Sequence, residues 1–369
     1  MVVSLRMVLD QLTQQVDPDV AEAEAEIARA LATTAPSGCE VTAIVPAGDE
    51  GAATAAVADL AGVTRAPLAR AKLTASWQLG IAPGVGGGLI HAGSLVAPLV
   101  RHDRVNENDQ TVVTLWDLCA WEAAGSLPRT VVAAQRALLK RAEKHADAVV
   151  VPTHAMAERL GGLSRLGGRV RVIPGAAPAG FAVPSDAVGR RRHLGVPDRV
   201  VVIAGGGCDD DALAAGLSAV GSLPLDDVEV VVSDVTGQNA SRVRGVADAA
   251  GLPETSVHVL PPLEPADRAA VLDAALALLA PSTLSGFPWR VVDALALGVP
   301  IVAVASDVHR EVLVDAGLFV PAAGLAEALH LVVDSEESRR RFAVRAADRG
   351  RAFSWRDHAE RVWALHAEL

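Results

Sequence analysis

The chain has 369 residues, of which 51% are hydrophobic and 21% charged, and its formal net charge is −11. This length suits two domains better than one hydrophobic core. The negative charge argues against a nucleic-acid-binding surface, which needs clustered Lys and Arg. No apolar run reaches the roughly 18 uncharged residues of a membrane span, so we expect at most peripheral contact with a membrane.

The cysteines and the first residues bear on the cellular compartment. Cys39, Cys119 and Cys208 form no C-x-x-C pair, which argues for incidental thiols in a reducing environment. Residues 2–9 predict a strand that an acidic helix follows, unlike the basic and then apolar order of a signal peptide. We therefore expect a cytoplasmic protein.

The first half of the chain alternates apolar strands with helices. Residues 2–9 predict a buried strand, residues 20–32 a helix, and residues 41–45 the next strand. This order predicts a parallel sheet with right-handed crossovers. Further strands are predicted at residues 111–115, 148–151 and 170–173.

Residues 80–93, GIAPGVGGGLIHAG, are rich in glycine. They lack the strand-to-helix context and the acidic residue of a dinucleotide-binding fingerprint. The segment predicts a loop in which backbones pass closely, with ligand contact as the alternative.

Residues 130–147 predict an amphipathic helix that carries Arg136, Lys140, Arg141 and Lys144. Four cations on one helix are typical of a solvated face. A face that lies on a membrane surface is the alternative.

The middle of the chain contains a Pro- and Gly-rich segment, PGAAPAG at residues 174–180, which predicts a linker. Strand–helix alternation restarts beyond it, with strands predicted at residues 200–204, 228–232 and 257–260. We therefore expect an α/β protein whose first domain is residues 1–176 and whose second is residues 177–345.

Two runs follow the strand at residues 200–204: the glycines Gly205, Gly206 and Gly207, and then the aspartates Asp209, Asp210 and Asp211. A glycine run after a strand favours phosphate, whereas three carboxylates repel it. Either a divalent cation such as Mg²⁺ intervenes, or the carboxylates cap a helix and no diphosphate binds. We expect no metal and no cofactor, with Mg²⁺ as the open alternative.

The most specific pattern lies at residues 277–307. A short apolar strand ends at Pro281-Ser282, and the loop to residue 288 carries Gly286-Phe287. The helix at residues 289–297 carries Asp293, and Gly298-Val299-Pro300, a strand at residues 301–304 and Ser306-Asp307 follow. A loop at the carboxyl end of a parallel strand that opens a helix N-terminus favours an anionic ligand.

This run resembles the donor-site signature of family 4 glycosyltransferases, which have the GT-B fold. By element order the resemblance covers nearly the whole chain, and it is specific at residues 146–160, 277–307 and 353–369. It implies two Rossmann-like, doubly wound parallel-sheet domains that face a cleft. The first would bind the acceptor and the second the nucleotide-sugar donor, and residues 346–369 would include a helix that crosses back to the first.

The resemblance also implies roles for individual residues. The donor-binding residues would be Gly205, Gly206, Gly207, Asp211, Gly286, Phe287, Arg290 and Asp293. Asp293 would hold the nucleotide ribose, and Arg290 with the helix N-terminus would stabilise the leaving diphosphate. Trp116, Asp117 and Ser285 stand at the catalytic positions of the family, and for Asp117 a loop-bonded or helix-capping carboxylate is the alternative.

Four departures from the family pattern concern the chemistry. The loop at residues 13–19 has no glycine, Trp116 replaces a histidine, the three aspartates replace Arg and Lys, and Ser285 replaces a carboxylate. An indole cannot exchange a proton near neutral pH. Two functions are therefore kept open. One is a retaining transferase that moves a hexose from a nucleotide-diphosphate sugar to a glycan or lipid-linked acceptor. The other is a catalytically degraded homologue that serves as a partner or scaffold for another protein.

Overall fold

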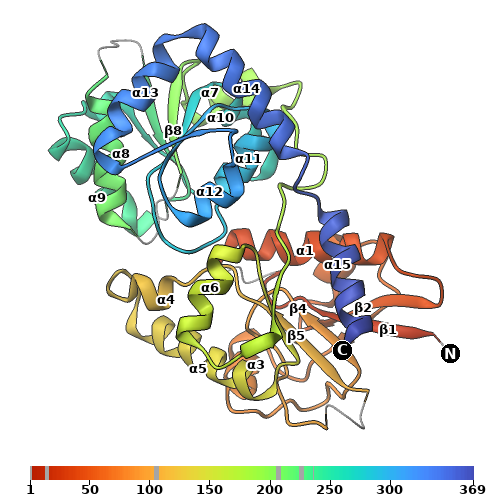
Figure 1. Ribbon diagram of the computed structural model, residues 1–369. Helices are drawn as coiled ribbons and strands as arrows, with labels where there is room; N and C mark the ends of the chain where they lie inside the picture. Colours follow the sequence, from red (N-terminus) through yellow and green to blue (C-terminus); the bar gives the residue numbers. More distant parts are fainter. Residues whose placement is uncertain (1, 13–15, 104–107, 205–208, 224–227, 236) are drawn as a thin grey trace. The chain divides into compact units, whose positions relative to one another are not determined.

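The computed structural model describes residues 2–12, 16–103, 108–204, 209–223, 228–235 and 237–369 (Figure 1). The chain forms two compact units. The first contains Met1–Pro178, Ser285–Phe287 and Ser354–Leu369, and the second contains Ala179–Leu284 and Pro288–Phe353.

The first unit is built on a seven-stranded parallel sheet in the order β3-β2-β1-β4-β5-β6-β7. Its strands are β1 (Val3–Val8), β2 (Cys39–Val45), β3 (Gly62–Arg65), β4 (Leu89–Ala92), β5 (Gln110–Thr114), β6 (Ala148–Val151) and β7 (Val170–Val172). Its helices are α1 (Pro18–Thr33), α2 (Glu50–Ala56), α3 (Arg70–Gln78), α4 (Cys119–Glu122), α5 (Arg129–His145), α6 (His154–Leu163) and α15 (Trp355–Glu368).

Helices cover both faces of this sheet. On one face α1 and α15 lie side by side (Figure 1), and the indole Nε1 of Trp363 donates to the carbonyl of Leu31 at 3.2 Å. The hydrophobic core on the other face gathers side chains of α3, α5 and α6, including Trp77, Leu138 and Met156. Burial of these apolar side chains is what holds the helices to the sheet.

The glycine-rich segment was predicted to be a loop, and this was wrong for its last residues. Leu89–Ala92 form β4, which pairs with β1 and β5 in the middle of the sheet. The close approach at these glycines comes from side chains rather than from another backbone. A Cβ on Gly87 would lie 2.1 Å from a carboxylate oxygen of Asp109.

The second unit is built on a six-stranded parallel sheet in the order β10-β9-β8-β11-β12-β13. Its strands are β8 (Val200–Ile203), β9 (Glu229–Val232), β10 (Val257–Val259), β11 (Ala275–Ala280), β12 (Ile301–Val304) and β13 (Leu318–Val320). Its helices are α7 (Ala187–Leu194), α8 (Asp210–Gly221), α9 (Gly237–Ala249), α10 (Pro265–Asp273), α11 (Trp289–Leu297), α12 (Asp307–Leu313), α13 (Leu325–Asp334) and α14 (Glu336–Gly350).

The strand–helix–strand segment formed by β11, α11 and β12 lies where the sequence predicted it. The helix α11 ends at Gly298, which adopts a left-handed conformation with φ of 70°. Such a C-terminal residue is usually glycine. A Cβ there would also lie 3.1 Å from the carbonyl oxygen of Ala343 on α14. The prediction of two parallel-sheet α/β domains is therefore confirmed.

Candidate functional site

The carboxyl edge of the second sheet brings together the loops that follow β8, β9 and β11. Asp209 caps α8: its Oδ1 accepts the amide of Ala212 at 3.0 Å, and its Oδ2 accepts the hydroxyl of Ser282 at 3.0 Å. The carboxylate thus ties the loop after β11 to the start of α8. Asp211 is exposed on the first turn of α8. The candidate donor glycines Gly205, Gly206 and Gly207 lie outside the described residues.

A network of buried charges lies at the same edge. The guanidinium Nε of Arg290 donates to Oδ2 of Asp234 at 2.9 Å, and its Nη1 donates to Oδ2 of Asp293. The Nε of Arg268 donates to that same Asp293 oxygen at 2.9 Å. Asp293 is only 3% exposed, so its charge is compensated by two arginines rather than by water.

Two further contacts fix the geometry of this network. Asp234 lies two residues after the end of β9, and its backbone is in a left-handed conformation with φ of 63°. Asp tolerates this conformation better than most residues. The hydroxyl of Ser233 donates to Oδ2 of Asp234 at 2.8 Å. The guanidinium of Arg268 donates to the carbonyl of Leu263 at 3.1 Å. Arg290, on the first turn of α11, is therefore held by contacts on several elements.

The residues Ser285–Phe287 pack with the first unit, against the segment after β5. The carboxylate of Glu122 accepts the amide of Ser285 at 2.6 Å and its hydroxyl at 2.9 Å. The same carboxylate pairs with Arg159 at 2.8 Å. Glu122 was not predicted to be a site residue, and a single glutamate at the end of a four-residue helix gives no sequence signal for such a contact.

The predicted residues Trp116 and Asp117 lie beside this loop. The Trp116 carbonyl accepts the amide of Phe287 at 2.8 Å, and its buried indole donates to the carbonyl of Gly93 at 2.7 Å. Asp117 forms an isolated antiparallel bridge with Gly286. Its Oδ1 accepts the amide of Cys119 at 2.8 Å, which is the loop-bonded arrangement considered as the alternative.

A pair of buried carboxyl groups at the carboxyl end of β1 was not predicted. Asp10 and Glu24 are both fully buried, and Arg70 approaches Asp10 at 2.9 Å. Burial raises the pKa of Asp10, against the charge of Arg70, and burial with the charge of Asp10 raises the pKa of Glu24 well above its ordinary value. The sequence held a signal for it. Glu24 interrupts the apolar stripe of α1 that is formed by Val20, Ile27 and Leu31.

The loop after β1 is acidic as well. Its residues 13–15 lie outside the described part of the chain. Asp17 caps α1 by accepting the amides of Asp19 and Val20. Burial, together with the charge of Asp19, raises the pKa of Asp17 to about 6.

Three buried histidines lie where α15 packs on the first sheet. Burial lowers the pKa of His358 to about 4 and the pKa of His366 to about 4. Burial also lowers the pKa of His91 well below its ordinary value. The rings of His91 and His366 meet edge to face, with their centres 5.7 Å apart. All three histidines therefore favour the neutral form.

The described residues contain no group of three or more His, Cys, Asp or Glu side chains that could hold a metal ion. No helix in the described ranges is long and apolar enough to cross a membrane. Of the predicted site residues, the first unit contains Trp116, Asp117, Ser285, Gly286 and Phe287. The second contains Asp211, Arg290 and Asp293.

Comparison with known proteins bears mainly on the second half of the chain. Residues 194–349 match the family model described as glycosyl transferases group 1. A comparison with curated protein sequences finds no match.

Several solved structures are similar over the whole chain. Sucrose-phosphate synthase from Thermosynechococcus elongatus has a TM-score of 0.70 and 18% identity, over 99% of this chain and 98% of that one. HepE from Anabaena in complex with UDP and glucose has a TM-score of 0.71 and 17% identity, over 99% and 100%. WaaG, a glycosyltransferase involved in lipopolysaccharide biosynthesis, has a TM-score of 0.68 and 14% identity, over 98% of both chains. The chain therefore has the GT-B fold that was predicted, and its second half resembles glycosyl transferases group 1.

Proposed function

We propose that this protein is a family 4-like glycosyltransferase that moves a hexose, with retention, from a nucleotide-diphosphate sugar to a glycan or lipid-linked acceptor. The proposal rests on the geometry of the β11–α11 segment. It places Arg290 on the first turn of a helix at the carboxyl edge of a parallel sheet, within the segment that matches glycosyl transferases group 1. A helix N-terminus and a guanidinium both favour a diphosphate.

In this proposal the residues of the second unit hold the donor. Arg290 and the N-terminus of α11 stabilise the charge that develops on the leaving diphosphate. Asp234 and Asp293 orient the Arg290 guanidinium through the contacts described above. Asp293 also accepts a ribose hydroxyl through its other carboxylate oxygen. Further donor contacts from this unit come from Gly205, Gly206, Gly207 and Asp211.

One similar protein supports the choice of donor. HepE was solved in complex with UDP-glucose. Fold alone does not assign a substrate, because one fold serves many reactions. The donor class therefore rests on the chemistry of the β11–α11 edge.

The second candidate function is that of a catalytically degraded homologue that binds a protein partner. The ion pairs that Arg268 and Arg290 form favour this second function. Both guanidinium groups already face carboxylates of the chain itself. A diphosphate that reaches Arg290 must compete with Asp234 and Asp293 for the same donors. Such competition costs affinity.

A turnover assay distinguishes the two functions. The protein is incubated with UDP-, GDP-, ADP- and dTDP-linked hexoses and an acceptor mixture, with Mg²⁺ and with chelator, and release of the nucleoside diphosphate is measured. We expect release from at least one donor, with the anomeric configuration of the product retained in its NMR spectrum. No release with any donor, together with capture of a specific protein partner, would favour the degraded homologue.

A further inference from the structure

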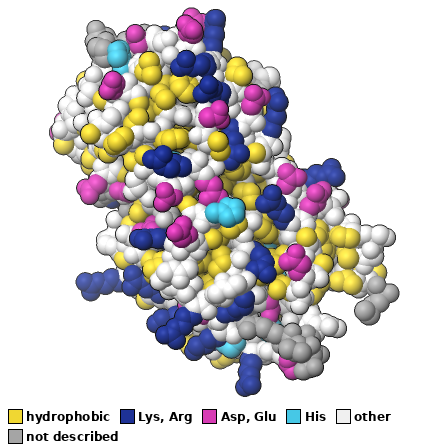
Figure 2. Space-filling view, viewed as in Figure 1, with side chains coloured by type: hydrophobic (Ala, Val, Ile, Leu, Met, Phe, Trp, Pro, Cys, Tyr) yellow, Lys and Arg dark blue, Asp and Glu magenta, His cyan; other side chains and the backbone are white. Residues whose placement is uncertain are grey.

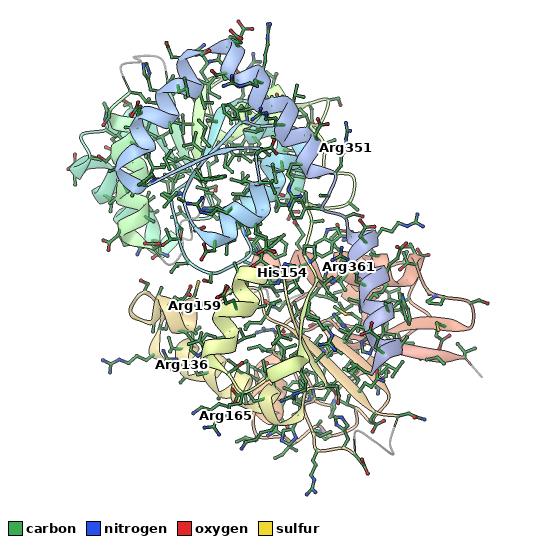
Figure 3. The ribbon with its side chains drawn as sticks, in the orientation of Figure 1. Arg136, His154, Arg159, Arg165, Arg351 and Arg361 are labelled. Atoms are coloured by element: carbon green, nitrogen blue, oxygen red, sulfur yellow. The ribbon has the colours of Figure 1, made fainter. Side chains whose placement is uncertain are left out.

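We propose that the outer face of α5 and α6 binds the anionic headgroups of a lipid bilayer. The cationic face is defined by six exposed side chains of the first unit: Arg129, Arg136, Lys140, Lys144, Arg159 and Arg165. Figure 2 shows Lys and Arg side chains gathered over and beside α5, and Figure 3 shows Arg136, Arg159 and Arg165 along this side of the unit.

The cations of α5 share one side of the helix. At about 100° per residue, Arg129, Arg136, Lys140 and Lys144 fall within an arc of roughly 80°. The opposite side carries Leu138, Leu139 and Ala142, which are buried in the core of the unit. The cations of α5 therefore point away from the core, because the apolar side of the helix packs against the sheet.

Local charge distinguishes this face from the rest of the chain. Residues 119–171 contain nine Lys and Arg against four Asp and Glu, a net charge of +5 in a chain whose net charge is −11. Three of the four carboxylates are already engaged. Asp147 is buried and accepts the amide of Thr111 at 2.7 Å, and Glu143 accepts the amide of Arg165 at 2.9 Å. Glu122 pairs with Arg159 at 2.8 Å, so the excess positive charge of the face lies mainly on α5, which has five Lys and Arg against one Glu.

Exposed apolar side chains lie among the cations and beside them, and they favour a bilayer over other polyanions. Ala133 is exposed within the cationic arc, Ala137 is exposed about 20° beyond its edge, and Leu163 at the end of α6 is 40% exposed. Clustered Lys and Arg side chains on a helix surface are attracted to the anionic headgroups of a bilayer. The remainder of the chain has a net charge of −16 and would repel a flexible nucleic acid that wraps around it. A flat bilayer contacts one face only.

The attraction can be put on a scale. Each Lys or Arg near an anionic bilayer surface raises the partition coefficient about fivefold. Removal of three such charges should therefore lower partitioning on the order of 100-fold. The attraction should fall as salt is raised, because the screening length shortens from about 10 Å at 0.1 M to about 3 Å at 1 M.

The experiment is sedimentation of the full chain with vesicles of phosphatidylcholine alone or of phosphatidylcholine and phosphatidylglycerol in equal parts. The test variant is Arg129→Gln, Lys140→Gln, Arg165→Gln. The matched control is Arg192→Gln, Arg244→Gln, Arg341→Gln, which removes three exposed cations from the second unit. Far-ultraviolet circular dichroism and a thermal melt check that both variants remain folded.

We expect wild type and the control to bind the anionic vesicles and the test variant to bind about 100-fold more weakly, with all three released by high salt. Equal binding to neutral vesicles, an equal loss in the control, or no binding by wild type would overturn the proposal. If single-stranded oligonucleotide, added at the same total charge as the anionic lipid, displaces the protein from the vesicles, the face would be assigned to nucleic acid instead. Vesicle binding needs no turnover, so the proposed function and this proposal can fail separately.

Discussion

The buried network around Asp293 gives the sharpest test of the second unit. In Asp293→Asn the side chain keeps its size but loses the charge that compensates Arg268 and Arg290. Arg290 would keep Asp234, and Arg268 would keep the carbonyl of Leu263. Breaking a buried ion pair from one side costs about 3–5 kcal/mol, so with these remaining partners we expect a loss of about 3 kcal/mol in the free energy of unfolding.

The measurement is urea unfolding followed by circular dichroism, together with hydrogen exchange of the β11 and α11 amides. The control is Asp211→Asn, at an exposed position of α8, which should change the free energy of unfolding by less than about 0.5 kcal/mol. If Asp293→Asn costs no more than the control does, the network is not a buried, mutually compensated set of charges. At protein concentrations where it is folded, the same variant should bind donor more weakly by roughly 1.5–3 kcal/mol, because it loses a charged hydrogen-bond acceptor for the ribose.

Three more predictions concern charge. In chelator, Asp211→Lys should tighten nucleotide-sugar binding by about 1 kcal/mol in calorimetry, because it reverses two units of exposed charge; loss of binding in Mg²⁺ would instead show that the carboxylate recruits a metal. The lowered pKa of His358 and His366, each to about 4, means that the unfolded chain binds more protons below pH 6.5. Stability of the first unit should therefore fall between about pH 6.5 and pH 4, by up to about 3 kcal/mol for each histidine, and His366→Gln should flatten the dependence of the urea midpoint on pH. Burial raises the pKa of Glu24, so ionisation of this carboxyl lowers the free energy of unfolding as pH rises above about 4.5. Glu24→Gln should therefore melt at a higher temperature than wild type at pH 8 and lose that advantage at pH 4.5.

The fold could be predicted from the sequence because its strongest signals are local. Short apolar runs bounded by turn residues gave the central strands, and α11 was predicted with its observed bounds, Trp289–Leu297. Strand β4 was missed because its four residues, Leu89–Ala92, follow a run of glycines. The edge strand β3, with no fully buried residue, has too few apolar residues to give a pattern.

The candidate site was less predictable, because its partners are far apart in the sequence. The sequence identified Arg290 and Asp293 but not Arg268 and Asp234, which reach them from other elements. Glu122 meets Ser285 across 163 positions of the chain. Asp209 was predictable as a helix cap from its place between a strand and a helix, and the structure shows it as one.

We propose that the second unit holds a nucleotide-diphosphate sugar beside Arg290. The most direct measurement is calorimetry of wild type and Arg290→Lys with the same panel of nucleotide sugars, with Mg²⁺ and with chelator. We expect saturable binding of at least one nucleotide sugar by wild type. We also expect at least tenfold weaker binding by Arg290→Lys, which keeps the charge but loses the planar fork that reaches Asp234 and Asp293. Absence of binding with every nucleotide sugar, or equal affinity in the two proteins, would contradict a donor site at Arg290.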